Sequence, residues 1–199
     1  MKRRTRGYTA VELMMALGLF AVGVSGIIAM QKLTIVSNQH AKNLAIATHI
    51  AQAWLDQLSA DSTLWTETAG INATRWVVNA NGSTDGVWQL PTWDAGRDFG
   101  AAFDALGAPV QAAANARFCT HVRLTTLFAE TGGLVGGRQT LANNGLARAE
   151  VRVFWLRDGA APIANACTQQ GTITAVADAT DVYHRVVKVS AVRQHGSAR

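Results

Sequence analysis

Glu12 is the ionisable residue with the most unusual position in the sequence. It follows a segment with four basic residues in its first six positions, and the next charged residue is Lys32. A carboxylate near the centre of a bilayer costs roughly 2.5–3.5 kcal/mol on insertion scales, so such groups are generally paired and functional. The chemistry expected of Glu12 is therefore ion pairing in an apolar medium, with a cationic partner that must be identified.

Cys119 and Cys167 are the only cysteines, and both lie downstream of the apolar stretch. If that part of the chain is exported, a disulfide between them is the natural interpretation. The bond would close a loop of about fifty residues and contribute on the order of 4 kcal/mol in the chain-entropy model. The alternative is two unpaired, buried thiols. No CxxC or HxxxH pattern accompanies the cysteines, so they do not indicate a metal site.

The remaining reactive residue types form no catalytic pattern. The histidines are dispersed at positions 40, 49, 121, 184 and 195. His121 and His184 lie on two expected strands and could meet across them, but a single strand histidine is usually a polar-face residue. No G-x-S-x-G or H-E-x-x-H motif occurs, and GGLVGGRQT lacks the GK[ST] of a phosphate-binding loop. The sequence therefore predicts no enzyme, no cofactor and no metal.

The segment after Glu12 has the composition of a membrane span. Residues 13–31 are nineteen uncharged positions, a helix of roughly 28 Å, close to a hydrocarbon thickness of about 30 Å. The basic residues precede it, so the positive-inside rule leaves the N-terminus in the cytoplasm. The candidate cleavage point, Gly7–Tyr8, comes before the apolar run, unlike that of a secretory signal peptide. We therefore expect a leader at 1–7, a retained membrane segment at 8–31 and a periplasmic part at 32–199.

The net charge of the chain resides mostly in the leader. The formal charge is +5 overall and falls to +1 from residue 8 onward. No basic stripe with interleaved aromatic residues occurs in the second half, so the sequence does not predict nucleic-acid binding.

Beyond Lys32 the apolar pattern becomes helical and one-sided. Apolar residues recur at three- and four-residue steps at Leu44, Ala47, Ala51, Trp54, Leu55 and Leu58. No proline or glycine occurs between Gly26 and Gly70. A single helix from about residue 9 to about 60 is therefore predicted, with its second half packed against a domain.

After residue 70 the pattern indicates strands. Three long strands are expected at Arg117–Phe128, Glu150–Leu156 and Val182–Val192, with a glycine-rich loop between the first two. RWVVNA at 75–80 and VWQL at 87–90 flank NGSTDG as a hairpin or loop, and 91–116 are expected to be irregular or weakly helical. The predicted class is α+β, with the long helix on a C-terminal antiparallel sheet.

The run Gly7-Tyr8-Thr9-Ala10-Val11-Glu12-Leu13 after a short basic leader resembles the processing motif of type IV prepilins and type II secretion pseudopilins. The resemblance implies the pilin fold, cleavage after Gly7 by a prepilin peptidase, methylation of the new N-terminus at Tyr8, and retention of Glu12 in a filament core. Tyr8 stands where the family usually has Phe. The run AVGVSGIIAMQ at 21–31 is similar to that of PilV-type minor pilins.

This resemblance implies a subunit of a tip or priming complex for type IV pilus assembly, with roles in adhesion and twitching motility. The implied partners are other minor pilins, the major pilin, the prepilin peptidase, the inner-membrane assembly platform and a PilY-type tip adhesin. The expected location is the inner membrane, then the pilus tip. The nearest alternative is a minor pseudopilin of type II secretion, followed by a signal-anchored periplasmic binding module, and last by a membrane-anchored enzyme.

Two groups of residues have more than one interpretation. The tryptophans are Trp54, Trp65, Trp76, Trp88, Trp93 and Trp155. They are expected to form the core, while Trp88 or Trp93 could instead lie at a subunit interface. The acids near NGSTDG and at 94, 98 and 104 could ligate calcium in loops, although their spacing is not that of an EF-hand.

Overall fold

The computed structural model describes residues 7–64, 76, 86–128, 134–135, 138–139, 146–157, 167, 179 and 181–193. The predicted leader lies outside these residues except for Gly7, as do Trp65 and most of the predicted hairpin around NGSTDG. The chain divides into two compact units, Met1–Asn43 and Leu44–Arg199, which are described separately.

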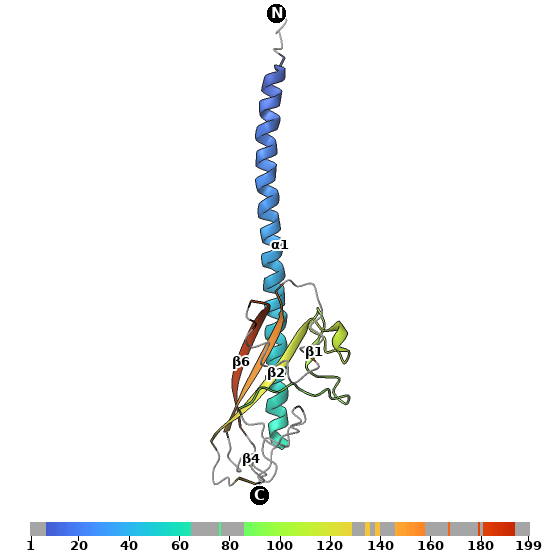
Figure 1. The fold of residues 1–199 in the computed structure, drawn as a ribbon, viewed down its shortest axis with the longest axis vertical. Coiled ribbons are helices and arrows are strands. Elements are labelled where there is room, and N and C mark those ends of the chain that lie inside the picture. The colour runs from blue at the N-terminus through green and yellow to red at the C-terminus, as the bar shows by residue number, and fades with distance from the viewer. Residues whose placement is uncertain are drawn as a thin grey trace, which may run out of the picture. The chain divides into compact units, whose positions relative to one another are not determined.

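The single long helix predicted from the sequence is present. α1 spans Ala10–Asp61 and is followed by a short 3-10 turn at Ser62–Leu64 (Figure 1). Within the first unit its apolar side chains are exposed, among them Leu19 and Phe20 at 77% and 69%. The helix is long and apolar enough to cross a membrane, with a mean hydropathy of 2.3 in its most apolar window. This coarse feature of the predicted anchor is therefore confirmed.

In the second unit α1 is one-sided, as the spacing predicts. Its buried side chains belong to Ala47, Ile50, Ala51, Trp54, Leu55, Leu58 and Asp61. Leu44, the first residue of the predicted apolar stripe, is 43% exposed. The stripe thus begins one turn later than the sequence pattern suggests.

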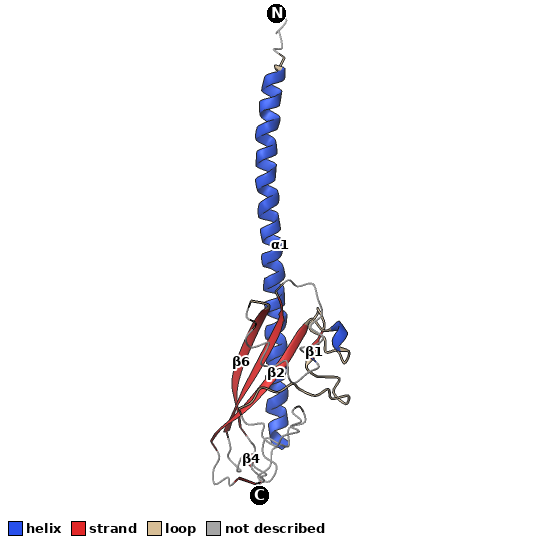
Figure 2. Ribbon diagram, viewed as in Figure 1, coloured by secondary structure: helices blue, strands red, loops and turns tan. Residues whose placement is uncertain are grey.

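The second half of α1 packs on an antiparallel sheet of four strands in the order β1-β2-β5-β6 (Figure 2). The strands are β1 (Ala102–Phe103), β2 (Phe118–Phe128), β5 (Leu146–Leu156) and β6 (Tyr183–Arg193). The three long strands expected from the sequence are present, although β5 begins at Leu146, four residues before the expected Glu150. The α+β arrangement is consistent with the pilin fold. A two-stranded pair, β3 (Leu134–Val135) and β4 (Arg138–Gln139), lies within the glycine-rich loop.

One face of the sheet lies against α1. Lys188 of β6 donates a hydrogen bond to the Gln52 side chain of α1 at 3.2 Å, so the face that carries Lys188 is turned to the helix. Val151 is opposite Lys188 in the ladder and shares this face, as do the small residues Ala147 and Ala149 further along β5. All three β5 residues are fully buried. The small side chains of Ala147 and Ala149 let the helix approach the sheet closely.

The first sheet edge is formed by β1, from residues 91–116 that were expected to be irregular or weakly helical, and by Gln89, from the VWQL segment expected to flank a hairpin or loop. β1 has only two residues, which pair with Phe118 and Cys119 of β2. Further along the same edge, Gln89 and Val122 exchange backbone hydrogen bonds of 2.7 and 2.9 Å. Two short segments thus pair with one edge of β2, and such short pairings leave little periodicity for a sequence pattern to reveal.

Candidate processing and assembly site

Gly7 and Tyr8 precede the first residue of α1. Tyr8 is 85% exposed, and a Cβ added to Gly7 would meet no atom within 4 Å. The predicted scissile bond therefore lies outside regular secondary structure and open to solvent in the structure. Nothing within 4 Å of Gly7 in the described chain requires glycine at this position.

Thr9 caps α1 through Glu12. The Thr9 hydroxyl oxygen accepts a hydrogen bond from the Glu12 backbone N–H at 3.3 Å, and the Thr9 carbonyl accepts one from Leu13 at 3.2 Å. Thr9 is thus the N-cap, and Glu12 is the third residue of the first turn. Thr-x-x-Glu is the sequence signature of a capping box. This signal is present in the sequence, but the sequence interpretation used Glu12 only as an ion-pairing residue.

The helix start provides a favourable field for the Glu12 carboxylate. Unsatisfied N–H groups give a helix N-terminus partial positive charge, which stabilises a nearby carboxylate by about 0.3–1 kcal/mol. Glu12 itself is exposed, and its apolar neighbours Val11, Leu13 and Met14 are 67%, 60% and 73% exposed. The carboxylate is therefore surrounded by apolar surface that the first unit itself does not bury.

Cys119 and Cys167 form the predicted disulfide. Their Cα atoms are 5.5 Å apart, and the sequence separation is 48 residues. Cys119 lies on β2 and is fully buried, and Cys167 is 7% exposed. The alternative of two unpaired thiols is thereby excluded, and the bond ties Cys167 to β2.

The second face of the sheet carries a buried polar cluster that the sequence pattern did not predict. Alternation along β5 places Arg152 on the sheet face away from Val151 and Val153, as the structure shows. Arg152 is nevertheless only 3% exposed. Its Nη2 lies 2.8 Å from Nδ1 of His121, the residue opposite it on β2. Glu150, 7% exposed, forms ion pairs with Arg123 and Arg148.

Trp88 lies over two arginines of this cluster. Its ring centroid is 4.6 Å from the guanidinium carbons of both Arg123 and Arg152. Burial, and then the positive charges of Arg185 and Arg123, lower the pKa of Arg152 to about 10. Trp88 therefore has a defined position within the second unit, where its ring faces these cations. The hypothesis that it lies at a subunit interface is not required to explain it.

The other tryptophans mostly form the expected core. Trp54 and Trp76 are fully buried with ring centroids 5.2 Å apart, and Trp54 also contacts Phe99 at 4.8 Å. Trp155 is 2% exposed. Trp93 packs against Gly100, where an added Cβ would lie 2.6 Å from the Trp93 ring.

The structure does not bring the other candidate side chains together. His121 and His184 are on β2 and β6, which are separated by β5, and their ladder partners are Arg152 and Trp155. The Asp94 carboxylate accepts the Gly96 N–H at 2.8 Å, and that of Asp104 accepts N–H groups within its own turn. Within the described ranges, no three side chains of His, Cys, Asp or Glu gather in a way that could hold a metal ion.

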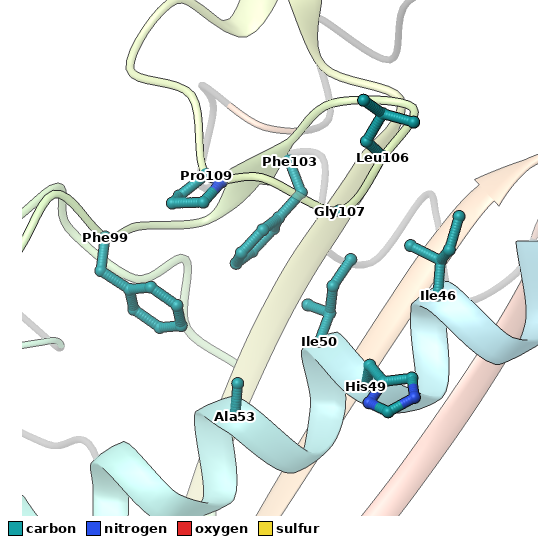
Figure 3. A pocket seen from close by; sticks show the side chains of 9 residues that line it. All are labelled: Ile46, His49, Ile50, Ala53, Phe99, Phe103, Leu106, Gly107 and Pro109. Carbon is teal, nitrogen blue, oxygen red and sulfur yellow. The ribbon is translucent and has the colours of Figure 1, made fainter.

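A shallow apolar groove of about 390 Å³ lies between α1 and the turn after β1. Figure 3 shows Ile46 and Ile50 of α1 pointing toward Phe103 and Leu106. The backbone at Gly107 lies close to Ile46 of α1, since a Cβ added to Gly107 would lie 2.9 Å from Cγ2 of Ile46. The lining offers a single ionisable side chain, His49, and so lacks the converging polar groups of a typical ligand site.

Comparison with protein-family models, with curated proteins and with solved structures finds no match to this chain. The class that fold and site define is thus an α+β protein with a long, apolar, N-terminal helix and a disulfide-bonded sheet unit.

Proposed function

We propose that this chain is a minor pilin, processed by a prepilin peptidase and incorporated into a tip or priming complex of a type IV pilus. The observation that carries the proposal is the order of features at the N-terminus. An exposed Gly7–Tyr8 bond is followed at once by a capped helix, with Glu12 in its first turn and an uncovered apolar surface beyond.

Processing would change the charge at the helix start. Hydrolysis of the Gly7–Tyr8 amide would leave a carboxylate on Gly7 and a new amine on Tyr8, which the peptidase would then methylate. The methylated amine remains a cation at neutral pH. A cation at the helix N-terminus is unfavourable in the field of the helix, and Glu12 in the first turn offsets it.

In a filament, Glu12 would pair with the Tyr8 amine of a neighbouring subunit. Apolar helices that leave the bilayer must bury the same surface against one another, and a carboxylate there is tolerable only when paired. The exposed apolar side chains from Val11 to Val36 would form that shared surface. The Glu12 carboxylate and the Tyr8 amine of the neighbour meet only when the two helices have one particular axial offset. The pair would therefore favour a fixed register between neighbouring subunits.

Before assembly the protein would reside in the inner membrane with the second unit in the periplasm, where a disulfide is stable. Its proposed partners are other minor pilins, the major pilin, the assembly platform and a PilY-type tip adhesin. The chain is proposed as a structural subunit that is itself the substrate of a peptidase.

The decisive experiment combines intact mass with two phenotypes. In cells with a prepilin peptidase, we expect a mature chain beginning at Tyr8, and a chain still beginning at Met1 would contradict the proposal. Deletion of the gene should reduce surface pili while leaving exoprotein secretion unchanged. The opposite pattern would identify a pseudopilin of type II secretion, and an unprocessed chain with both phenotypes intact would favour a signal-anchored binding module.

A further inference from the structure

We propose that the outer edge of β6 is a docking site for an extended, acidic segment of a partner protein, which adds to the sheet as a further strand. The inference concerns the second unit alone and does not depend on the proposed function. β6 is the last strand in the order β1-β2-β5-β6, and its eleven residues Tyr183–Arg193 pair with β5 on one side.

The backbone groups at this edge can be assigned from the ladder. Arg157 donates a hydrogen bond to the Val182 carbonyl at 2.9 Å, and bonded and non-bonded pairs alternate in an antiparallel ladder. The β5–β6 register runs without a break. Val186 and Lys188 therefore bond to β5, whereas the N–H and C=O groups of Val187 and Val189 point outward.

The side chains at the outward positions are also open. Val187 and Val189 are 47% and 55% exposed, and Ala191 is exposed as well. Within the described residues, no backbone hydrogen bond outside the sheet ladder involves these three positions. Outward donors and acceptors next to exposed β-branched side chains are what an added strand recognises.

The positive charge of β6 favours an acidic partner segment at its outer edge. The strand contains Arg185, Lys188 and Arg193 and no acidic residue. A second copy of β6 would bring like charges across the new ladder, which destabilises cross-strand pairs. On the sheet face of Val187 and Val189, the described strands carry one acid, Glu150, which is opposite Val189 and pairs with Arg123 and Arg148. Arg152 of β5 and Arg185 of β6 leave this face with a net positive charge. An extended segment with acidic and apolar residues in alternation therefore fits, and a second copy does not.

The test uses the full chain in detergent micelles and two fluorescein-labelled peptides, EVEVTVE and KVKVTVK. Fluorescence anisotropy should show binding of the acidic peptide, with the basic peptide weaker by at least about tenfold and the difference reduced by salt. Hydrogen exchange should show the amides of Val187, Val189 and Ala191 slowed when the acidic peptide binds.

Two substitutions at position 189 distinguish a loss of peptide binding at the edge of β6 from a loss of folding. Val189→Pro removes an outward donor and no bond to β5, so the sheet should stay intact while peptide affinity falls by about tenfold or more. Val189→Thr keeps the donor and the β-branch and should bind like the wild type.

Three results would overturn the proposal. The first is no binding of the acidic peptide, and the second is equal binding by the Pro and Thr variants. The third is slow exchange of the outward amides in the free protein, which would mean that this edge is already paired. A fourth contrary result would be dimers that disappear on Val189→Pro, which would assign the edge to a second copy.

Discussion

The hydroxyl of Thr9 accepts a hydrogen bond from the backbone N–H of Glu12, and this contact defines where α1 begins. It links the residue after the proposed mature N-terminus to the acid on which assembly is proposed to depend. The helix cap thus sets the position of Glu12, since Thr9 fixes the first turn and this turn holds the Glu12 carboxylate near the helix N-terminus.

Replacing Thr9 should loosen the first turn without affecting the sheet unit. Thr9→Ala should cost about 0.5–2 kcal/mol of local helix stability, because the Glu12 N–H loses its acceptor. Hydrogen exchange of the amides from Val11 to Leu13 in micelles should be faster, and Thr9→Ser should restore it. Unchanged exchange in Thr9→Ala would mean that the cap contributes nothing in that environment.

Removing the charge of Glu12 should block assembly but not processing. A buried ion pair that loses one partner leaves the other uncompensated, at a cost of about 3–5 kcal/mol. Glu12→Gln should therefore lower the amount of the chain recovered in sheared pili by at least about tenfold. Intact mass should still show cleavage after Gly7, and Glu12→Asp should retain more assembly than Glu12→Gln. Wild-type recovery of Glu12→Gln would contradict the pairing.

Trp54 should contribute far more to stability than Leu44, although both belong to the predicted apolar stripe. Trp54 is fully buried between Trp76 and Phe99, whereas Leu44 is 43% exposed. Trp54→Ala should lower the free energy of unfolding by about 3–5 kcal/mol, and Leu44→Ala by no more than about 1 kcal/mol. Urea denaturation of the full chain measures both, and equal losses would show that burial along α1 is not as described.

Substitutions at Gly107 and Gly86 can distinguish the cost of a steric clash with Ile46 from the cost of backbone strain. Both have positive φ, +84° and +71°, but only Gly107 has an atom within 3 Å of an added Cβ, namely Cγ2 of Ile46. Gly86→Ala should cost about 1–2 kcal/mol from the left-handed backbone. Gly107→Ala should cost about 1–3 kcal/mol more.

A double substitution isolates that contact. In an Ile46→Ala background, Gly107→Ala should be less damaging than in the wild type, because the clashing methyl is gone. Denaturation midpoints of the four chains of this cycle give the coupling free energy. Additive losses would place the cost in the backbone alone.

Reduction of the Cys119–Cys167 bond should destabilise the second unit. With a sequence separation of 48 between the cysteines, the chain-entropy model gives a loss of about 4 kcal/mol. Denaturation with and without dithiothreitol measures this difference. A Cys119→Ala, Cys167→Ala double variant should match the reduced wild type and should not respond to dithiothreitol. Equal stability of the oxidised and reduced wild type would contradict the prediction.

The long elements could be predicted from the sequence because their patterns are long. A 52-residue helix without internal proline, and three strands of eleven residues each, carry enough period to be recognised. β1 and the pairing of Gln89 with Val122 could not be predicted, since each involves only one or two residues and is set by the neighbouring strand.

The polar cluster was missed for a different reason. Alternation assigns Arg152 to one face of the sheet but does not say whether that face is covered. Trp88, which comes from a segment far from β5 in the chain, lies over Arg123 and Arg152 on this face, and the periodicity of β5 does not indicate that contact. At the helix start, by contrast, the Thr9-x-x-Glu12 signature in the sequence is sufficient to predict the cap.

The position of the disulfide in the chain has a consequence for folding if the second unit is exported as proposed. The loop between Cys119 and Cys167 contains β5 but excludes β6, which begins only at Tyr183. A chain that emerges in the N-to-C direction can therefore be oxidised before its last strand is released. In such a chain β6 would pair with a β5 that the covalent loop already holds near β2, and the last step of folding would be the addition of one strand to a cross-linked intermediate.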